Sequence, residues 1–211
     1  MVGRPPNFGG FDEASDVTIQ SDGKIVVAGT RDVSGDFDFA LVRFRPRGGL
    51  DKTFDGDGKV TSDIGFQDAA AGLAIDGDGR IVVVGYSDNT FAVARYGTTG
   101  SPDVGFDGDG LVTTAIGTES YASDVAIDGD ERIVVVGYAY IRGESDFALA
   151  RYGSTGLPDA SFGGAGTIAT DLAVQDSANG AAIQADGKIV AVGQAASMGG
   201  EQNFAVTRYL G

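Results

Sequence analysis

The sequence predicts an all-β fold built from four copies of one unit, arranged as a β-propeller. A run of β-branched residues recurs and ends each time in glycine, at Gly29, Gly85, Gly137 and Gly193. A second motif of the form DFALARY recurs once after each of these glycines and contains an arginine, at Arg43, Arg95, Arg151 and Arg208. The period of about 52–56 residues fits one four-stranded blade, and blades bury their faces only against one another.

Each unit is expected to contain four short antiparallel strands, A to D. Strands A, B and C of the third unit are expected at residues 125–127, 132–138 and 147–152, and the D strands at residues 59–64, 111–116 and 167–172. These segments are rich in Val, Ile, Thr and aromatic residues, and Gly, Asp or Pro bound them. Strand B is apolar on both faces, as at residues 81–84, which predicts a sheet that is covered on both sides.

The four units are expected to form one domain over residues 1–211, with repeats at about 13–67, 68–120, 121–172 and 173–211. Only three D strands are present, so one blade is expected to have three strands. Three architectures remain open: a closed four-bladed monomer, half of an eight-bladed ring that a second copy completes as a homodimer, or a segment of a larger protein. Open ends would expose apolar blade faces, which favours closure or dimerisation.

Composition excludes several classes of function. The net charge of −15 would repel nucleic acid, so no nucleic-acid partner is expected. The absence of cysteine and histidine excludes disulfides, thiol nucleophiles, Ser-His-Asp triads and imidazole metal sites. No apolar run is long enough to insert into a membrane, and the first ten residues lack the features of a signal peptide.

The A–B turns carry acidic pairs such as Asp76 and Asp78. The second Asp recurs in every unit, whereas the first is replaced by Gln20 and Gln184 in the outer two units. Asp-Gly is favoured in tight hairpins, and the segment lacks the remaining ligands of an EF-hand loop. The pattern therefore favours a hairpin turn over a calcium site, with Asp78 as the turn residue.

The C–D loops hold the better cation candidates, Asp55, Asp57, Asp107 and Asp109. The third copy of this loop loses both acids, which favours a solvated turn over a metal site, with Phe54, Phe106 and Phe162 packed into the blade. The repeated arginines are expected to pair with a carboxylate or with backbone carbonyls between blades.

One mouth of the central channel is the expected ligand site. Strand A is expected to be innermost, so that Asp16 and Asp124 face each other across the channel and are candidates to hold a cation. The D–A and B–C loops at this mouth vary between repeats, as binding loops on a rigid frame do. Their aromatic and polar residues suit a sugar or peptide ligand: Tyr86, Asp88, Asn89, Tyr121, Tyr138, Tyr140, Arg142 and Glu144.

The repeat "ASDVAIDGDERIVVVGYAYIRGESDFALARYGSTGLPDASFGGAGTIATD" resembles the delta-60 repeat of bacterial β-propellers. The resemblance covers the chain from about Phe8 to Tyr209. It implies a propeller of secreted or surface-associated bacterial proteins, and the family offers no catalytic residues to transfer.

The expected function is a non-catalytic binding or scaffold module of a bacterial extracellular or surface protein. Its ligand, a protein or a carbohydrate, would contact the channel-mouth loops, and Ca²⁺ is the candidate cofactor. Two alternatives remain: a hydrolase or lyase that uses carboxylates and tyrosines at the mouth, or a lectin with one site per blade. The rim residues do not repeat, which counts against four equivalent lectin sites.

Overall fold

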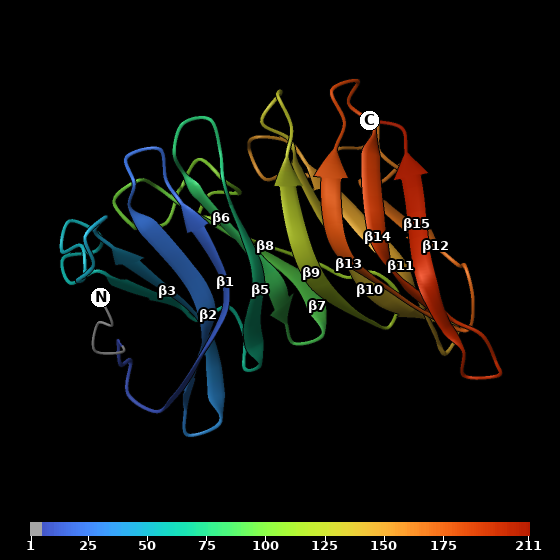
Figure 1. Cartoon of the computed structure of the whole chain (residues 1–211), viewed down its shortest axis with the longest axis horizontal. Coiled ribbons are helices and arrows are strands. Elements are labelled where there is room, and N and C mark those ends of the chain that lie inside the picture. The colour runs from blue at the N-terminus through green and yellow to red at the C-terminus, as the bar shows by residue number, and fades with distance from the viewer. Residues whose placement is uncertain (1–5) are drawn as a thin grey trace.

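The computed structural model describes residues 6–211 and shows four sets of antiparallel strands in a row (Figure 1). The first sheet contains β1 (Phe11–Ile19), β2 (Ile25–Val33), β3 (Asp36–Phe44) and β4 (Lys59–Ser62). The second contains β5 (Asp68–Ile75), β6 (Ile81–Ser87), β7 (Thr90–Tyr96) and β8 (Leu111–Thr114). The third contains β9 (Glu119–Ile127), β10 (Ile133–Ile141), β11 (Glu144–Tyr152) and β12 (Thr167–Thr170), and the fourth β13 (Gln175–Ile183), β14 (Ile189–Ala196) and β15 (Gln202–Tyr209).

Each set of strands is one blade, with its strands paired in chain order, and one parallel pair, Ser145 with Gln175, joins the third and fourth blades into a seven-stranded sheet. The A strands β1, β5, β9 and β13 pack against one another from blade to blade, so they form the inner edge. The all-β class, the four repeats and the single three-stranded blade are therefore confirmed, and the incomplete blade is the fourth. The expected domain limits stay a prediction, and residues 1–5 lie outside the described part of the chain.

The repeated glycine of strand B has a steric cause. Strand A contains a β-bulge in every blade, for example between Ala122 and Asp124 in β9. At this bulge the backbone approaches strand B so closely that a Cβ on Gly137 would overlap the carbonyl oxygen of Tyr121. Only glycine fits there, and the bulge re-aims the side chain of Asp124.

Three apolar clusters form the core, and each lies between two consecutive blades. Strand B contributes to two clusters at once: Val82 and Val84 face the third blade, whereas Ile81 and Val83 face the first. All four side chains are completely buried. Each blade therefore depends on its neighbours for stability, as the apolar pattern of strand B predicted.

The two end blades each have one face without a neighbouring blade, so the ring is not closed within residues 6–211. Phe204 is 99% exposed and Val206 66% exposed, whereas Phe147 and Leu149, at the same positions of the third blade, are completely buried. On the first blade, Val17 and Ile19 are 58% and 69% exposed. A cavity of ≈ 340 Å³ is lined by Val27, Val42 and Phe44 of this blade and by Pro6 and Phe8 of the N-terminal segment. Within residues 6–211, no helix is long and apolar enough to cross a membrane.

Candidate functional site

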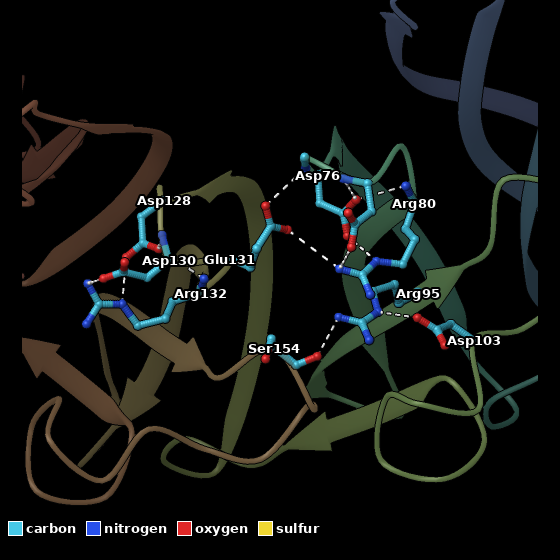
Figure 2. A network of polar contacts seen from close by, with 11 residues as sticks. Asp76, Arg80, Arg95, Asp103, Asp128, Asp130, Glu131, Arg132 and Ser154 are labelled. Carbon is cyan, nitrogen blue, oxygen red and sulfur yellow. Dashed lines mark hydrogen bonds and ion pairs between the residues drawn. The ribbon is translucent and has the colours of Figure 1, made fainter.

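The A–B turns form a structural network (Figure 2). Asp76 Oδ1 accepts hydrogen bonds from the backbone N–H groups of Asp78 (3.0 Å) and Arg80 (2.8 Å), and Asp76 Oδ2 lies 2.6 Å from Arg80 Nε. Asp128 and Arg132 repeat this arrangement in the third blade. Asp76 is buried and Asp78 is exposed, so the first Asp holds the turn here, contrary to the expectation for Asp78. In the outer two blades the second Asp does hold the turn, because Asp22 and Asp186 accept the N–H groups of Lys24 and Lys188.

This network also joins neighbouring blades. Glu131 of the third blade accepts a hydrogen bond from Gly77 N (3.2 Å) and lies 3.6 Å from Arg80 Nη2. Arg95 pairs with Asp103 in its own blade (2.8 Å) and donates to Ser154 O of the next blade (2.6 Å), as Figure 2 shows. The expected use of the repeated arginines between blades is confirmed at Arg95 and, through Thr98 O, at Arg43.

The C–D loop carboxylates lie on the surface. Asp57 accepts a hydrogen bond from Lys59 N (2.8 Å), and Asp109 accepts one from Leu111 N (2.9 Å). Asp55 and Asp107 have positive φ angles of 46° and 49°. None of the three-carboxylate groups that converge within residues 6–211 contains any of these four, so their role as metal ligands gains no support from the geometry.

Asp16 and Asp124 lie on the inner edge and join blades. Asp16 Oδ2 accepts a hydrogen bond from Leu73 N of the second blade (2.8 Å), and Asp124 Oδ2 accepts one from Ala181 N of the fourth (2.8 Å). The second oxygen of each carboxylate accepts the N–H of the following residue. Burial raises the pKa of Asp124, and the charge of Asp16 adds to the rise.

Gly72 separates these two carboxylates in the order of the blades. A Cβ on Gly72 would lie 3.1 Å from Asp124 Cα, so the second blade packs its backbone directly against the third at this point. The observed geometry thus gives both aspartates a structural task along the inner edge. Their proposed role in cation binding stays a prediction.

Four of the expected rim residues come together as one group, which we call the tyrosine row: Tyr86, Tyr121, Tyr138 and Tyr140. The rings of Tyr121 and Tyr138 stack with centroids 5.2 Å apart. Tyr86 meets Tyr121 edge to face at 5.0 Å, and Tyr140 meets Tyr138 in the same way at 6.0 Å. The row crosses from β6 of the second blade to β9 and β10 of the third.

Polar contacts fix the centre of the tyrosine row. The hydroxyl of Tyr121 lies 2.8 Å from Asn89 Oδ1 and 3.0 Å from Glu119 Oε2. Burial and the neighbouring carboxylate of Glu119 raise the pKa of Tyr121 to about 12, so this hydroxyl stays neutral at physiological pH. The row therefore offers uncharged aromatic faces with fixed polar edges.

Three further expected rim residues lie in tight turns, and the last one, Glu144, is the first residue of β11. Asp88, Asn89 and Arg142 all have positive φ angles, of 45°, 66° and 56°. Asp88 accepts hydrogen bonds from Phe66 N (3.2 Å) and Gln67 N (3.1 Å), which orders the neighbouring D–A loop. Arg142 is exposed at the β10–β11 turn. Ligand binding by any rim residue stays a prediction.

Two groups of carboxylates were not expected from the sequence. The first acid triad is Asp38, Asp63 and Asp68, and the second acid triad is Asp146, Asp171 and Asp176. A signal was present, because the intervals between the three aspartates are identical in the two triads. Each triad combines residues from two repeats, however, and only the packing of one blade on the next brings them together.

A family model described as "Domain of unknown function (DUF5122) beta-propeller" matches residues 20–54, 77–106, 129–162 and 184–210, which together make up more than half of the chain. The chain belongs to this β-propeller family. One match falls in each of the four blades. A search of curated proteins found no match.

Two solved structures are similar in fold. One is the acylaminoacyl peptidase of Pyrococcus horikoshii, with 12% identity, a TM-score of 0.47, and coverage of 92% of this chain and 32% of the peptidase. The other is the α-L-arabinofuranosidase PaAbf62A from Podospora anserina in complex with cellotriose, with 14% identity, a TM-score of 0.48, and coverage of 97% and 66%. This chain thus spans about a third of the peptidase. With TM-scores below 0.5, these similarities carry no argument about function.

Proposed function

We propose that this chain is a non-catalytic binding module of a bacterial extracellular or surface protein, of the delta-60 type, and that its ligand contacts the tyrosine row. The observation that carries the proposal is the contact of four tyrosines across two blades, at the end where the loops differ between repeats. Residues that recur in every repeat explain the fold. The tyrosine row, by contrast, has no equivalent in the first or fourth blade.

The chemistry of the row favours a carbohydrate, with an apolar protein side chain as the second choice. Aromatic rings pack against the apolar face of a sugar, and polar groups at their edges bind its hydroxyls. Asn89 and Glu119 supply such groups beside Tyr121. The net charge of −15 disfavours anionic ligands.

The two alternative functions have less support. A hydrolase would need Asp16 and Asp124 free for proton transfer, but every oxygen of both carboxylates accepts a backbone hydrogen bond. A lectin with one site per blade would need an equivalent row in each blade. Thr30 and Gln194 occupy the position of Tyr86 and Tyr138 in the outer blades, which supports one site per chain.

The repeats supply a matched variant for the test. Tyr138→Gln with Tyr140→Ala gives the third blade the residues that the fourth blade has at these positions, Gln194 and Ala196. We expect a glycan array followed by calorimetry to identify a ligand that the double variant binds at least ten-fold more weakly. Asp78→Asn, at the opposite end of the same blade pair, should bind normally. Unchanged binding by the double variant, or equal loss in Asp78→Asn, would refute a site at the row.

We also propose that a second copy of the chain closes the ring to eight blades. The exposed residues Val192, Phe204 and Val206 of the fourth blade stand where Val136, Phe147 and Leu149 of the third blade are completely buried by the next blade. The first blade has an apolar cavity, lined by Val27, Val42 and Phe44 and by Pro6 and Phe8 of the N-terminal segment, and exposes Val17 and Ile19. Each internal interface thus shows how the two free faces would pack.

One repeat position that differs in the first blade supports this pairing. Tyr96, Tyr152 and Tyr209 each contact a hydroxyl on the D strand of the preceding blade. The first blade has Phe44 at this position. The blade that would precede it in the ring is the fourth, and residues 6–211 give that blade no D strand and therefore no such hydroxyl. The two end blades are therefore matched to each other.

Light scattering tests the ring. We expect the mass of two chains for the wild type and of one chain for Phe204→Asp, whose position is exposed in the single chain and so tolerates the change without unfolding. Circular dichroism should be the same for both. A wild-type protein with the mass of one chain, or a series of ever larger species, would overturn the proposal.

A further inference from the structure

Two equivalent groups of carboxylates occupy the interface between the first and second blades and the interface between the third and fourth. In each acid triad, one oxygen from each of the three carboxylates lies within 4.8 Å of the other two. The members come from strand C of one blade, from the loop after its D strand, and from the start of strand A in the next blade. A ligand held there would therefore contact both blades.

The most buried member of each triad has an oxygen without a partner. Asp68 is completely buried, and its Oδ2 accepts hydrogen bonds from Ile64 N (2.7 Å) and Gly65 N (3.1 Å). Asp176 is 1% exposed, and its Oδ2 accepts hydrogen bonds from Leu172 N (2.6 Å) and Ala173 N (2.9 Å). In both residues, Oδ1 is buried and has no hydrogen bond of normal geometry within residues 6–211; the Ser87 hydroxyl is a neighbour of the Asp68 carboxyl. A buried carboxylate oxygen without a partner is costly unless a ligand fills that role.

Positive charge around the triads does not balance three carboxylates. Arg31 Nε lies 3.4 Å from Asp38 Oδ2 in the first triad, and among residues 6–211 no ion pair reaches the second triad. Three carboxylates this close repel one another, and a bound cation would remove that repulsion.

The second blade provides an internal comparison. Thr90, Ala115 and Ser120 occupy the three triad positions there, so the interface between the second and third blades carries no charge at this point. Ser120 is completely buried, and its hydroxyl accepts hydrogen bonds from Phe91 N (3.2 Å) and Ile116 N (3.4 Å). A hydroxyl is thus sufficient to order the D–A loop, and the fold does not require the acids.

We propose that each acid triad binds one Ca²⁺ ion, so that one chain carries two calcium sites that hold the first blade to the second and the third to the fourth. Calcium prefers six to eight oxygen ligands at about 2.3–2.6 Å and accepts irregular geometry. The three carboxylates supply part of this set. Asp63 and Asp171 are exposed, so water reaches the ion and completes its coordination.

Calorimetry of chelator-treated protein with CaCl₂ tests the proposal. We expect two ions per chain for the wild type, one for Asp171→Asn and none for the double variant Asp63→Asn with Asp171→Asn. These two residues are exposed and order no loop, so their variants should fold. The matched control is Asp57→Asn with Asp109→Asn, which removes two exposed C–D loop acids and should still bind two ions.

Thermal unfolding supplies a second measurement. A ligand that binds only the native state raises its stability, so millimolar calcium should raise the Tm of the wild type and leave that of the double variant unchanged. No binding by the wild type at millimolar calcium would overturn the proposal. Two ions bound by the double variant, or loss of binding in the C–D loop control, would also overturn it.

Discussion

The three interfaces between blades share one frame but differ at the rim. At the C–D loops, each buries a phenylalanine under an arginine, with the guanidinium carbon 4.5–4.6 Å from the ring centroid: Arg43 over Phe54, Arg95 over Phe106 and Arg151 over Phe162. At the rim, the two outer interfaces carry an acid triad and an aspartate on the inner edge. The middle interface has Ser120, Gly72 and the tyrosine row instead.

This difference follows a period of two blades. Asp16, Gly72, Asp124 and Gly180 alternate along the inner edge, and the acid triads alternate in the same way. Residues that every blade needs for its structure recur in each blade. Residues that differ between the interfaces recur in every second blade. The proposed binding groups therefore recur with the pair of blades, whereas the structural motifs recur with the single blade.

Loss of the shared phenylalanine should have the largest effect. We expect Phe54→Ala and Phe106→Ala each to lower the free energy of unfolding by about 3–5 kcal/mol, because both side chains are completely buried. Urea unfolding measures the loss. If one of the two interfaces tolerated the change within about 1 kcal/mol, the interfaces would not share a common frame.

Transfer of the acids to the middle interface should have the next largest effect. The variant with Thr90→Asp, Ala115→Asp and Ser120→Asp should be about 3 kcal/mol less stable than the wild type in chelator, because it buries carboxylates without a counter-charge. Calcium should restore much of this loss, and calorimetry should find three ions per chain. Two ions would mean that the three positions alone do not define a site.

The inner-edge aspartates offer a smaller and more local difference. Asp124→Ala leaves the N–H of Ala181 without its acceptor, which should cost about 1–3 kcal/mol. Asp124→Asn keeps an acceptor and should cost less. Urea unfolding of the two variants separates the hydrogen bond from the charge, and equal losses would show that the negative charge is what matters.

Low pH should destabilise the folded protein in part through protonation of Asp159. Hydrogen bonds from Ser161 and the charge of Arg151 lower the pKa of this carboxyl below its usual value. A carboxyl with a lowered pKa in the folded state stabilises the protein above its unfolded pKa of about 3.9, and this contribution is lost as the pH falls through the folded value. Unfolding midpoints between about pH 5 and pH 2.5 should therefore fall less in Asp159→Asn than in the wild type. Parallel curves would contradict this assignment.

The smallest effect on stability is expected at the outer end of the tyrosine row. Tyr140 is 37% exposed and touches Tyr138 only by its edge, so Tyr140→Ala should change the free energy of unfolding by about 0.5 kcal/mol or less. Ligand affinity should nevertheless fall. A large loss of stability would show that the tyrosine row is needed for the packing of the blades.

The repeats made the fold predictable from the sequence, because the glycine, arginine and phenylalanine motifs report the same close contacts in every blade. The tyrosine row was partly predictable for the same reason: Tyr86 and Tyr138 share one repeat position on adjacent blades. The turn residue was misjudged because recurrence favoured Asp78, whereas burial and hydrogen bonding select Asp76.

The acid triads and the open ring could not be predicted in this way. Asp38 and Asp68 belong to different repeats, and they meet only because strand A of one blade packs beside strand C of the preceding one. Ring closure depends on the angle between successive blades, which no single motif encodes. The sequence therefore defines each blade better than it defines the assembly of blades.

The glycine of strand B provides a marker for comparing related genes. Any side chain at Gly29, Gly85, Gly137 or Gly193 would collide with the bulged carbonyl of strand A, so each blade must retain one such glycine. The number of these glycines in a homologous reading frame should then equal its number of blades. On the proposed two-copy ring, a single gene that encodes eight of them would be the fused counterpart of two of these chains.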